Sequence, residues 1–174
     1  MIIKNVKVYT EDKTFVPGEV AVADGKFAAE ASDSEVLDGE GCYMIPGLVD
    51  IHFHGCIGDD FCDASEEAIA NMAKYEASIG VTSICPATMT LSEDDLHNIM
   101  KTAGACSGTE GAKLVGINME GPFISAKKKG AQAADHIRKC DVELFRKLQE
   151  ESGGLIRLVD IAPENDGQWN SSVK

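Results

Sequence analysis

The sequence of 174 residues is poor in basic residues, poor in aromatic residues and free of long apolar runs. Its 16 lysines and arginines are outnumbered by 29 aspartates and glutamates, and the net charge of −13 argues against binding to nucleic acid or to an anionic membrane surface. No apolar run approaches the roughly 20 residues of a membrane-spanning helix. Residues 1–9 alternate as in a strand and lack the layout of a signal peptide, so a cytoplasmic location is expected.

The sequence also lacks any Cys-x-x-Cys pair, although it contains six cysteines. Their irregular spacing matches neither a zinc nor a disulfide pattern, and in a reducing compartment they are predicted to be buried or incidental thiols. Cys56 and Cys62 flank a loop that follows a histidine-rich segment, where they could approach a metal. Packing as small apolar side chains under the loop is the commoner role for such thiols.

The most informative segment runs from Pro46 to Gly55, with the sequence Pro-Gly-Leu-Val-Asp-Ile-His-Phe-His-Gly. It predicts one buried strand, in which Asp50, His52 and His54 share a face because successive side chains alternate across a strand. The opposite, apolar face carries Val49, Ile51 and Phe53. Imidazole is a common neutral ligand for zinc and iron, so two imidazoles on one face indicate half of a metal site. A hydrogen-bonded histidine pair on a polar sheet face is the alternative.

A second candidate ligand ends another predicted strand, over residues 113–120. Val115, Ile117 and Met119 alternate there with Gly116, Asn118 and Glu120. Glu120 comes directly before Gly-Pro, which breaks a strand. Because the chemistry of parallel barrels gathers at the carboxyl ends of their strands, Glu120 is expected at the level of the two histidines. An exposed loop carboxylate is the alternative.

The rest of the chain alternates between strand and helix patterns. Residues 1–45 predict short strands and turns, including a hairpin turn at Asp24-Gly25. Further strands are expected over 82–88 and 156–162. Helices are expected after the capping residues Asp63 or Ser65, Ser92 and Asp141, and the first of them is expected to bury Ala68, Met72, Tyr75 and Ile79. This alternation predicts a parallel sheet that is covered by helices.

Two segments together resemble a known family. The segment from Pro46 to Gly55 resembles the first barrel strand of the amidohydrolase superfamily, which comprises metal-dependent hydrolases built on a TIM-type barrel. Residues 116–124, Gly-Ile-Asn-Met-Glu-Gly-Pro-Phe-Ile, and residues 128–132, Lys-Lys-Gly-Ala-Gln, are similar to N-acetylglucosamine-6-phosphate deacetylases. The resemblance extends from residue 1 to about residue 167, and residues 120–124 are its most specific part.

The resemblance implies an α/β fold in two parts. Residues 1–45 would form part of a small β-sandwich domain, and residues 46–174 an incomplete amidohydrolase (β/α) barrel. About four strands of a TIM-type (β/α)8 barrel are present, and a closed barrel typically needs about 250 residues. Residues 168–174 are polar and aperiodic, so the fourth strand lacks its helix. The chain is therefore predicted to be the N-terminal half of a larger enzyme.

The resemblance also implies roles for individual residues. Glu120 would be the principal metal ligand, and His52 and His54 would hold a second ion that some members bind; the divalent metal is expected to be zinc or iron. Ala131 and Gln132 match a pair that contacts the sugar. Two further histidine ligands and the acid/base aspartate would lie beyond residue 174, so no catalytic residue is assigned within the chain.

The function implied for the full-length enzyme is metal-dependent deacetylation of N-acetylglucosamine 6-phosphate to glucosamine 6-phosphate and acetate, with residues 1–174 alone inactive. The His-x-His strand also permits a dihydroorotase-like amidohydrolase that acts on a cyclic amide. A third possibility is a non-catalytic half-barrel that serves as an assembly module. Residues 82–88 or the fourth strand would form an open sheet edge, so a homodimer or a complementing C-terminal fragment is expected as partner.

Four other features carry predictions of their own. His97 is expected to face solvent from the polar side of its helix, and His136 is expected at the surface. Asp160 alternates with apolar neighbours and is expected to point inward. Residues 127–129, three lysines, are expected to be a solvated charge run that could steer an anionic sugar phosphate.

Overall fold

The computed structural model describes residues 1–30, 35–106, 108 and 110–165, and it divides the chain into two compact units, Met1–Pro46 and Gly47–Lys174. This division falls one residue after the predicted boundary. The assignment of the units to a β-sandwich and a barrel stays a prediction, and the polar segment 168–174 lies outside the described residues. In the described part of the chain, no helix is long and apolar enough to cross a membrane.

The first unit is a sheet in the order β3-β2-β1-β4, with β5 also paired to β1. Its strands are β1 (Ile2–Tyr9), β2 (Phe15–Ala23), β3 (Lys26–Ala28), β4 (Val36–Asp38) and β5 (Tyr43–Met44). The β2–β3 hairpin turns at Asp24 and Gly25, whose φ values of 51° and 70° are those of the predicted turn.

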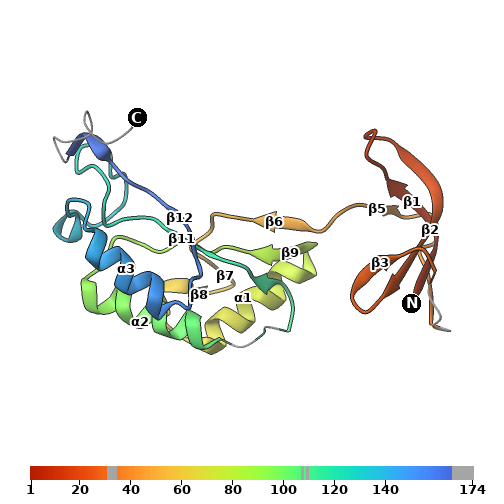
Figure 1. The fold of residues 1–174 in the computed structure, drawn as a ribbon, viewed down its shortest axis with the longest axis horizontal. Helices are drawn as coiled ribbons and strands as arrows, with labels where there is room; N and C mark the ends of the chain where they lie inside the picture. The colour runs from red at the N-terminus through yellow and green to blue at the C-terminus, as the bar shows by residue number, and fades with distance from the viewer. Residues whose placement is uncertain (31–34, 107, 109, 166–174) are drawn as a thin grey trace. The chain divides into compact units, whose positions relative to one another are not determined.

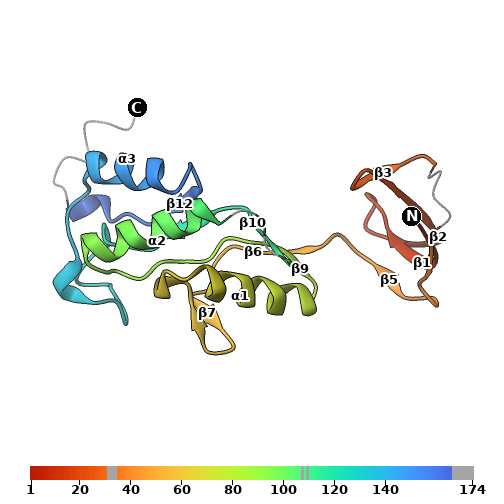
Figure 2. The same ribbon diagram turned by 90° about the horizontal axis from the view of Figure 1, so that it is seen from below.

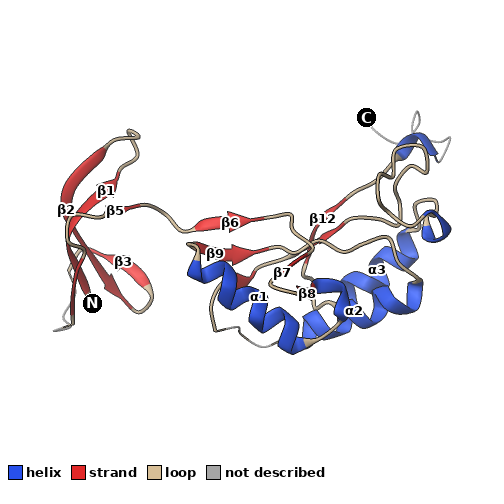
Figure 3. Cartoon of the chain, turned by 180° about the vertical axis from the view of Figure 1, so that it is seen from behind, coloured by secondary structure: helices blue, strands red, loops and turns tan. Residues whose placement is uncertain are grey.

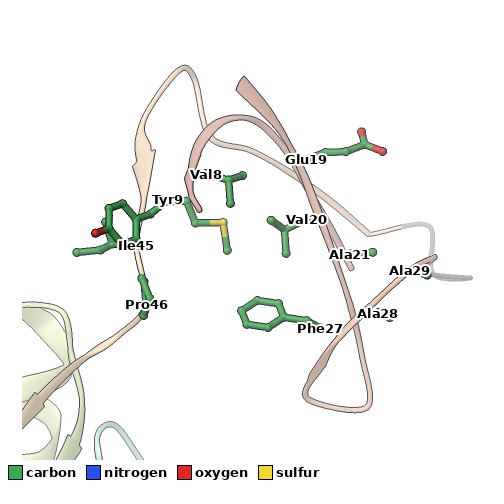
Figure 4. Close-up of a pocket in the computed structure, with 11 residues that line it drawn as sticks. Val8, Tyr9, Glu19, Val20, Ala21, Phe27, Ala28, Ala29, Ile45 and Pro46 are labelled. Carbon is green, nitrogen blue, oxygen red and sulfur yellow. The ribbon is translucent and has the colours of Figure 1, made fainter. Parts of the chain in front are cut away.

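This sheet bears an open, largely apolar hollow of about 370 Å³ (Figure 4). Side chains from β1, β2, β3 and the segment after β5 line it, among them Val8, Val20, Phe27 and Ile45. Phe27 is 77% exposed in the described structure. The first unit therefore leaves apolar surface uncovered within the described residues.

The second unit contains parallel strands, as predicted. One sheet has the order β10-β9-β6, with strands Lys113–Leu114, Val81–Ile84 and Leu48–Asp50, and a second pairs β11 (Ile117–Met119) with β12 (Ile156–Val159). A parallel bridge between Ala87 and Asn118 joins the extension of β9 to β11. A short antiparallel hairpin of β7 (Gly55–Cys56) and β8 (Asp59–Asp60) follows the histidine segment.

The helices of the second unit lie on one side of its strands (Figures 1, 2 and 3). They are α1 (Glu66–Ser78), α2 (Glu93–Ala105) and α3 (Val142–Glu151), with short 3-10 turns at Phe61–Asp63, Ala134–His136 and Pro163–Asn165. The side chains of Ser65, Ser92 and Asp141 cap the three α-helices, as the sequence predicts. Between helices and strands lies an apolar core that includes Met72, Leu96, Ile117, Met119 and Leu148.

The prediction of one buried strand over residues 46–55 is wrong. The strand ends at Asp50, whose carboxylate accepts a hydrogen bond from the His52 backbone N–H at 2.9 Å. Val49 and Ile51 are 59% and 55% exposed, because β6 is the edge strand of its described sheet and lacks a neighbouring strand on one side. The chain beyond Asp50 nevertheless stays beside the extension of β9, since the Phe53 carbonyl accepts from the Ala87 N–H at 2.7 Å.

Three further expectations about the elements need correction. The predicted strand 113–120 is divided into β10 and β11, which pair with different neighbours. Residues 82–88 do not form an open edge, because β9 lies between β6 and β10; within the described residues β12 is paired only with β11. Tyr75 on α1 and Ile79 at its C-cap are 40% and 55% exposed, and Ile69 and Ala73 take the buried positions beside Ala68 and Met72.

Candidate metal centre

Three side chains of the second unit converge at one point, as their positions in the sequence predict. The ligand atoms of His52, His54 and Glu120 all lie within 4.8 Å of one another. Glu120 Oε2 is 3.4 Å from His52 Nε2 and 3.2 Å from His54 Nε2. The two imidazole rings are 5.4 Å apart between centroids and nearly perpendicular, at 78°.

The local fold explains this convergence. His52 and His54 follow β6 along the extension of β9, and Glu120 follows β11, whose residue Asn118 is bridged to Ala87 on that same extension. Gly121, two residues after the end of β11, has a φ of +79°, and a Cβ there would lie only 2.0 Å from Thr90 Oγ1. Glycine is therefore required at this close approach, which fixes the backbone directly after Glu120.

The polar atoms of the group fit a cation. The Ala87 carbonyl accepts from His54 Nδ1 at 3.2 Å, so neutral His54 carries its lone pair on Nε2. That lone pair faces the buried Oε2 of Glu120, which accepts no hydrogen bond among the described residues. Two acceptors 3.2 Å apart repel unless a cation or a proton lies between them. Two imidazoles and a carboxylate are a donor set of the kind that catalytic zinc uses, and imidazole suits iron as well.

Asn118 is a further polar residue of this centre. Its contact with His52 was not predicted from the sequence. Its Nδ2 lies 3.0 Å from His52 Nδ1 and donates to the Ile51 carbonyl at 3.1 Å. The side chain is only 5% exposed. The available signal was its spacing: a polar residue two positions before Glu120, between apolar Ile117 and Met119, lies on the same face of the strand.

Gln132, the predicted sugar contact, is buried. Its Oε1 accepts from the Thr90 N–H at 2.6 Å, and its Nε2 lies 3.6 Å from Met89 Sδ. Ala131 beside it is exposed. In the described structure the Gln132 amide therefore holds residues 89–90, and its contact with a sugar stays a prediction.

The prediction that His97 faces solvent is wrong. His97 is 8% exposed, because α3 packs on α2 and brings Glu151 against the imidazole. Glu93 Oε1 lies 3.6 Å from His97 Nε2 on the other side. His97 is therefore part of the contact between two helices and does not belong to the metal group. His136, by contrast, is exposed as expected.

The remaining candidates lie outside the metal group. Asp160 is exposed and lies just beyond β12, and the expectation that it points inward stays a prediction. Cys56 and Cys62 are free, half-buried thiols that pack against the core. Burial raises the pKa of Cys62 to about 12, which disfavours the thiolate that a metal requires. In the lysine run, Lys127 and Lys128 are exposed, while Lys129 Nζ donates to the Gln132 carbonyl at 2.8 Å.

Comparisons with known proteins agree with the family resemblance, although no family model matches the chain. An N-acetylglucosamine-6-phosphate deacetylase of Bacillus subtilis is 35% identical over 178 residues, covering 95% of this chain and 45% of the relative. An N-acetylgalactosamine-6-phosphate deacetylase of Escherichia coli is 28% identical over 169 residues, covering 95% of this chain and 45% of the relative. The crystal structure of N-acetylglucosamine-6-phosphate deacetylase from Pasteurella multocida superposes with a TM-score of 0.83 at 23% identity, over 94% of this chain and 45% of that one.

The chain thus spans a little under half the length of these curated relatives. The structural match supports the mixed α/β fold, and the sequence matches supply the family. The chain belongs to the N-acetylglucosamine-6-phosphate deacetylase family and matches the N-terminal part of its members.

Proposed function

We propose that the chain forms the N-terminal, metal-binding part of an enzyme that deacetylates N-acetylglucosamine 6-phosphate. The convergence of His52, His54 and Glu120 within 4.8 Å carries this proposal. The names of the relatives support the substrate class, since they are deacetylases of amino-sugar phosphates. Within this proposal the three side chains hold a divalent ion, and Asn118 and the Ala87 carbonyl orient the two imidazoles.

A divalent ion at this position would supply a Lewis acid for the acetyl carbonyl and would lower the pKa of a bound water. The role of this chain is to hold the ion with two neutral imidazoles and one carboxylate. The Ala87 carbonyl holds the His54 imidazole with its lone pair on Nε2, and loss of a supporting contact of this kind typically lowers metal affinity by about 10–100-fold.

We propose further that residues 1–174 alone do not turn over substrate. The resemblance assigns the acid/base aspartate and two further metal ligands to a region beyond residue 174, and the chain covers only 45% of the length of the Bacillus relative. The exposed β6 and β12 and the apolar hollow of the first unit favour association with a second copy or with a complementing C-terminal fragment. Sedimentation at low micromolar concentration tests the association, and a sharply melting monomer would contradict it.

The activity is tested most directly in a chimera. Residues 1–174 replace the matching part of the Bacillus subtilis relative, and acetate release from N-acetylglucosamine 6-phosphate is measured with zinc or iron. The chimera is expected to be active, its Glu120→Gln form inactive, and the 174-residue chain alone inactive. A folded, metal-loaded chimera without acetate release contradicts the proposal. Should the chimera fail to fold, co-expression of residues 1–174 with the C-terminal part of that relative gives the same comparison.

Two alternative substrates belong in the same assay. The similarity to an N-acetylgalactosamine-6-phosphate deacetylase favours testing the galactosamine isomer beside the glucosamine one. Dihydroorotate tests the alternative of a cyclic amidase. Ring opening without acetate release would replace the deacetylase proposal, and binding to a partner without either activity would favour a non-catalytic assembly module.

A further inference from the structure

The carboxamide of Asn118 is held tightly beside His52. Its Nδ2 lies 3.1 Å from the Ile51 carbonyl oxygen and 3.0 Å from His52 Nδ1. The side chain is 5% exposed, and its backbone is fixed in the sheet by hydrogen bonds with Pro86 and Thr88. Little freedom remains except for turning the carboxamide over.

The two orientations of this carboxamide are not equivalent. In the observed one, the two hydrogens of Nδ2 reach two acceptors, the Ile51 carbonyl and His52 Nδ1. If the carboxamide were turned over, Oδ1 would face the Ile51 carbonyl oxygen at 3.1 Å, and two acceptors would oppose each other. The buried Oδ1 has no hydrogen-bond partner among the described residues. After the turn, Nδ2 would occupy this position and would lack a hydrogen-bond partner there. The observed orientation is therefore the more stable one.

We propose that Asn118 is a positioning residue that sets the tautomer of His52. Because Nδ2 can only donate, His52 Nδ1 accepts, and the hydrogen of the neutral imidazole is on Nε2. The Ala87 carbonyl imposes the opposite tautomer on His54, whose Nδ1 must donate. In the metal-free protein, His54 and Glu120 thus offer lone pairs to a cation, whereas His52 carries its hydrogen on Nε2, the ring nitrogen 3.4 Å from Glu120 Oε2.

This difference makes the two histidines unequal ligands. His52 can bind a metal through Nε2 only after its hydrogen moves to Nδ1 and the Asn118 carboxamide turns over to accept it. That turn breaks the hydrogen bond from Nδ2 to the Ile51 carbonyl. His54 and Glu120 therefore capture the ion first, and Asn118 weakens His52 as a ligand. This consequence rests on the proposed metal centre, whereas the tautomer itself does not.

The tautomers can be read directly in the metal-free chain. Long-range ¹⁵N–¹H correlation spectra of the imidazoles, at a pH where they are neutral, distinguish hydrogen on Nδ1 from hydrogen on Nε2. His52 is expected as the Nε2–H form and His54 as the Nδ1–H form, while the exposed His136 serves as the solvent-averaged reference. A wild-type spectrum with His52 as Nδ1–H, or as the same mixture as His136, overturns the proposal without any variant.

Two substitutions then separate positioning from a merely structural role. Asn118→Asp presents an acceptor to His52 Nδ1 and should convert His52 to the Nδ1–H form, whereas Asn118→Leu should shift it towards the His136 mixture. If Asn118 only held Ile51 in place, neither substitution would change the tautomer of His52. If His52 in folded Asn118→Asp protein remains in the Nε2–H form, the carboxamide does not set the tautomer.

Zinc affinity provides a second readout that does not depend on activity. The Asn118→Asp protein should bind Zn²⁺ at least about 10-fold more tightly than the wild type, which is the usual size of an effect from a group that orients a ligand. Since the added charge alone attracts a cation, the matched control is the same substitution in a His52→Gln background, where the gain should vanish. A gain that persists without His52 would show that charge, not tautomer, is responsible. An inactive enzyme would refute the proposed function and leave the tautomer result standing.

Discussion

The imidazole of His97 on α2 is hydrogen-bonded through Nδ1 to the carboxylate of Glu151, the last residue of α3. Glu93, one turn earlier on α2, lies 3.6 Å from the other ring nitrogen and 2.9 Å from Arg138. Lys101 adds a contact of 3.5 Å to Glu151. A network of ion pairs and hydrogen bonds therefore joins the two helices.

This network predicts a loss of stability in acid. Burial acts to raise the pKa of Glu151, but the hydrogen bond and charge of His97 and the Lys101 ammonium outweigh it, and the pKa lies below 4.5. The hydrogen bond from Arg138 likewise lowers the pKa of Glu93 below 4.5. A carboxyl with a lowered pKa stabilises the fold fully above its unfolded value and loses that contribution as the pH falls through its folded value. The melting temperature should therefore drop steeply below about pH 4.5.

The variant that isolates this effect is Glu151→Gln. It keeps the shape of the side chain but removes its titration, so its melting temperature should fall less steeply in acid than that of the wild type. Glu143→Gln, which alters an exposed ion pair with Arg146 on α3, is the matched control and should retain the wild-type slope. An unchanged acid slope in Glu151→Gln would contradict the assignment.

The buried carboxyl of Glu76 should give stability the opposite dependence on pH. It is 5% exposed on α1, and its pKa is raised first by burial and then by the negative charge of Asp50. The folded protein therefore holds the proton more tightly than the unfolded chain, and stability falls as the pH rises above 4.5. Glu76→Gln should raise the melting temperature at pH 7 and have little effect at pH 4. Glu67→Gln, at an exposed position of the same helix, should leave the melting temperature unchanged at both pH 7 and pH 4.

Much of the local structure was predictable because its causes are local. Ser65, Ser92 and Asp141 each cap a helix at the position expected from the sequence, since a side-chain oxygen satisfies amide groups that no other residue reaches. The convergence of the two histidines with Glu120 was predicted from the common level of parallel strand ends, and it is found although β6 ends at Asp50, before both histidines. Metal binding by these residues stays a prediction.

The features that escaped prediction depend on contacts distant in sequence. His97 and Glu151 are 54 residues apart, and the helical pattern around His97 alone indicates a polar, solvated face. The exposure of Val49 and Ile51 reflects the position of β6 at a sheet edge, which a run of apolar residues does not reveal. The hydrogen bonds that bind Gln132 to residues 89–90 likewise need the packed structure.

Gly104 tests the packing of α2 on α3. A Cβ at this position would lie 2.5 Å from the backbone oxygen of Glu151 and 3.0 Å from the Ser152 carbonyl carbon. Backbone atoms must move to accommodate it, and overpacking usually costs about 1–3 kcal/mol. Since alanine in a helix returns about 1 kcal/mol, Gly104→Ala should lower the free energy of unfolding by up to about 2 kcal/mol. Gly18→Ala is the control, since its Cβ meets Val8 at an ordinary 3.9 Å.

Cys62 should be chemically inert in the folded protein. Burial is the main cause that raises its pKa to about 12, so almost no thiolate is present at pH 8. Peptide mapping after treatment with iodoacetamide should find Cys42, which is exposed, modified and Cys62 unmodified, and both modified after unfolding. Rapid labelling of Cys62 under native conditions would mean that the segment around it opens readily.

The metal centre leads to the last prediction, which concerns the isolated chain. Among the residues that the structure describes, the group consists of three side chains, His52, His54 and Glu120, and catalytic zinc sites commonly add a fourth ligand from water. We expect weak, substoichiometric zinc binding by calorimetry, with affinity falling as the pH falls because only neutral imidazole binds a metal. Glu120→Gln should weaken binding more than His52→Asn, since Glu120 contacts both imidazoles whereas His52 is held by Asn118. Tight one-to-one binding that survives a chelator wash would contradict this expectation, and so would an equal loss from the two substitutions.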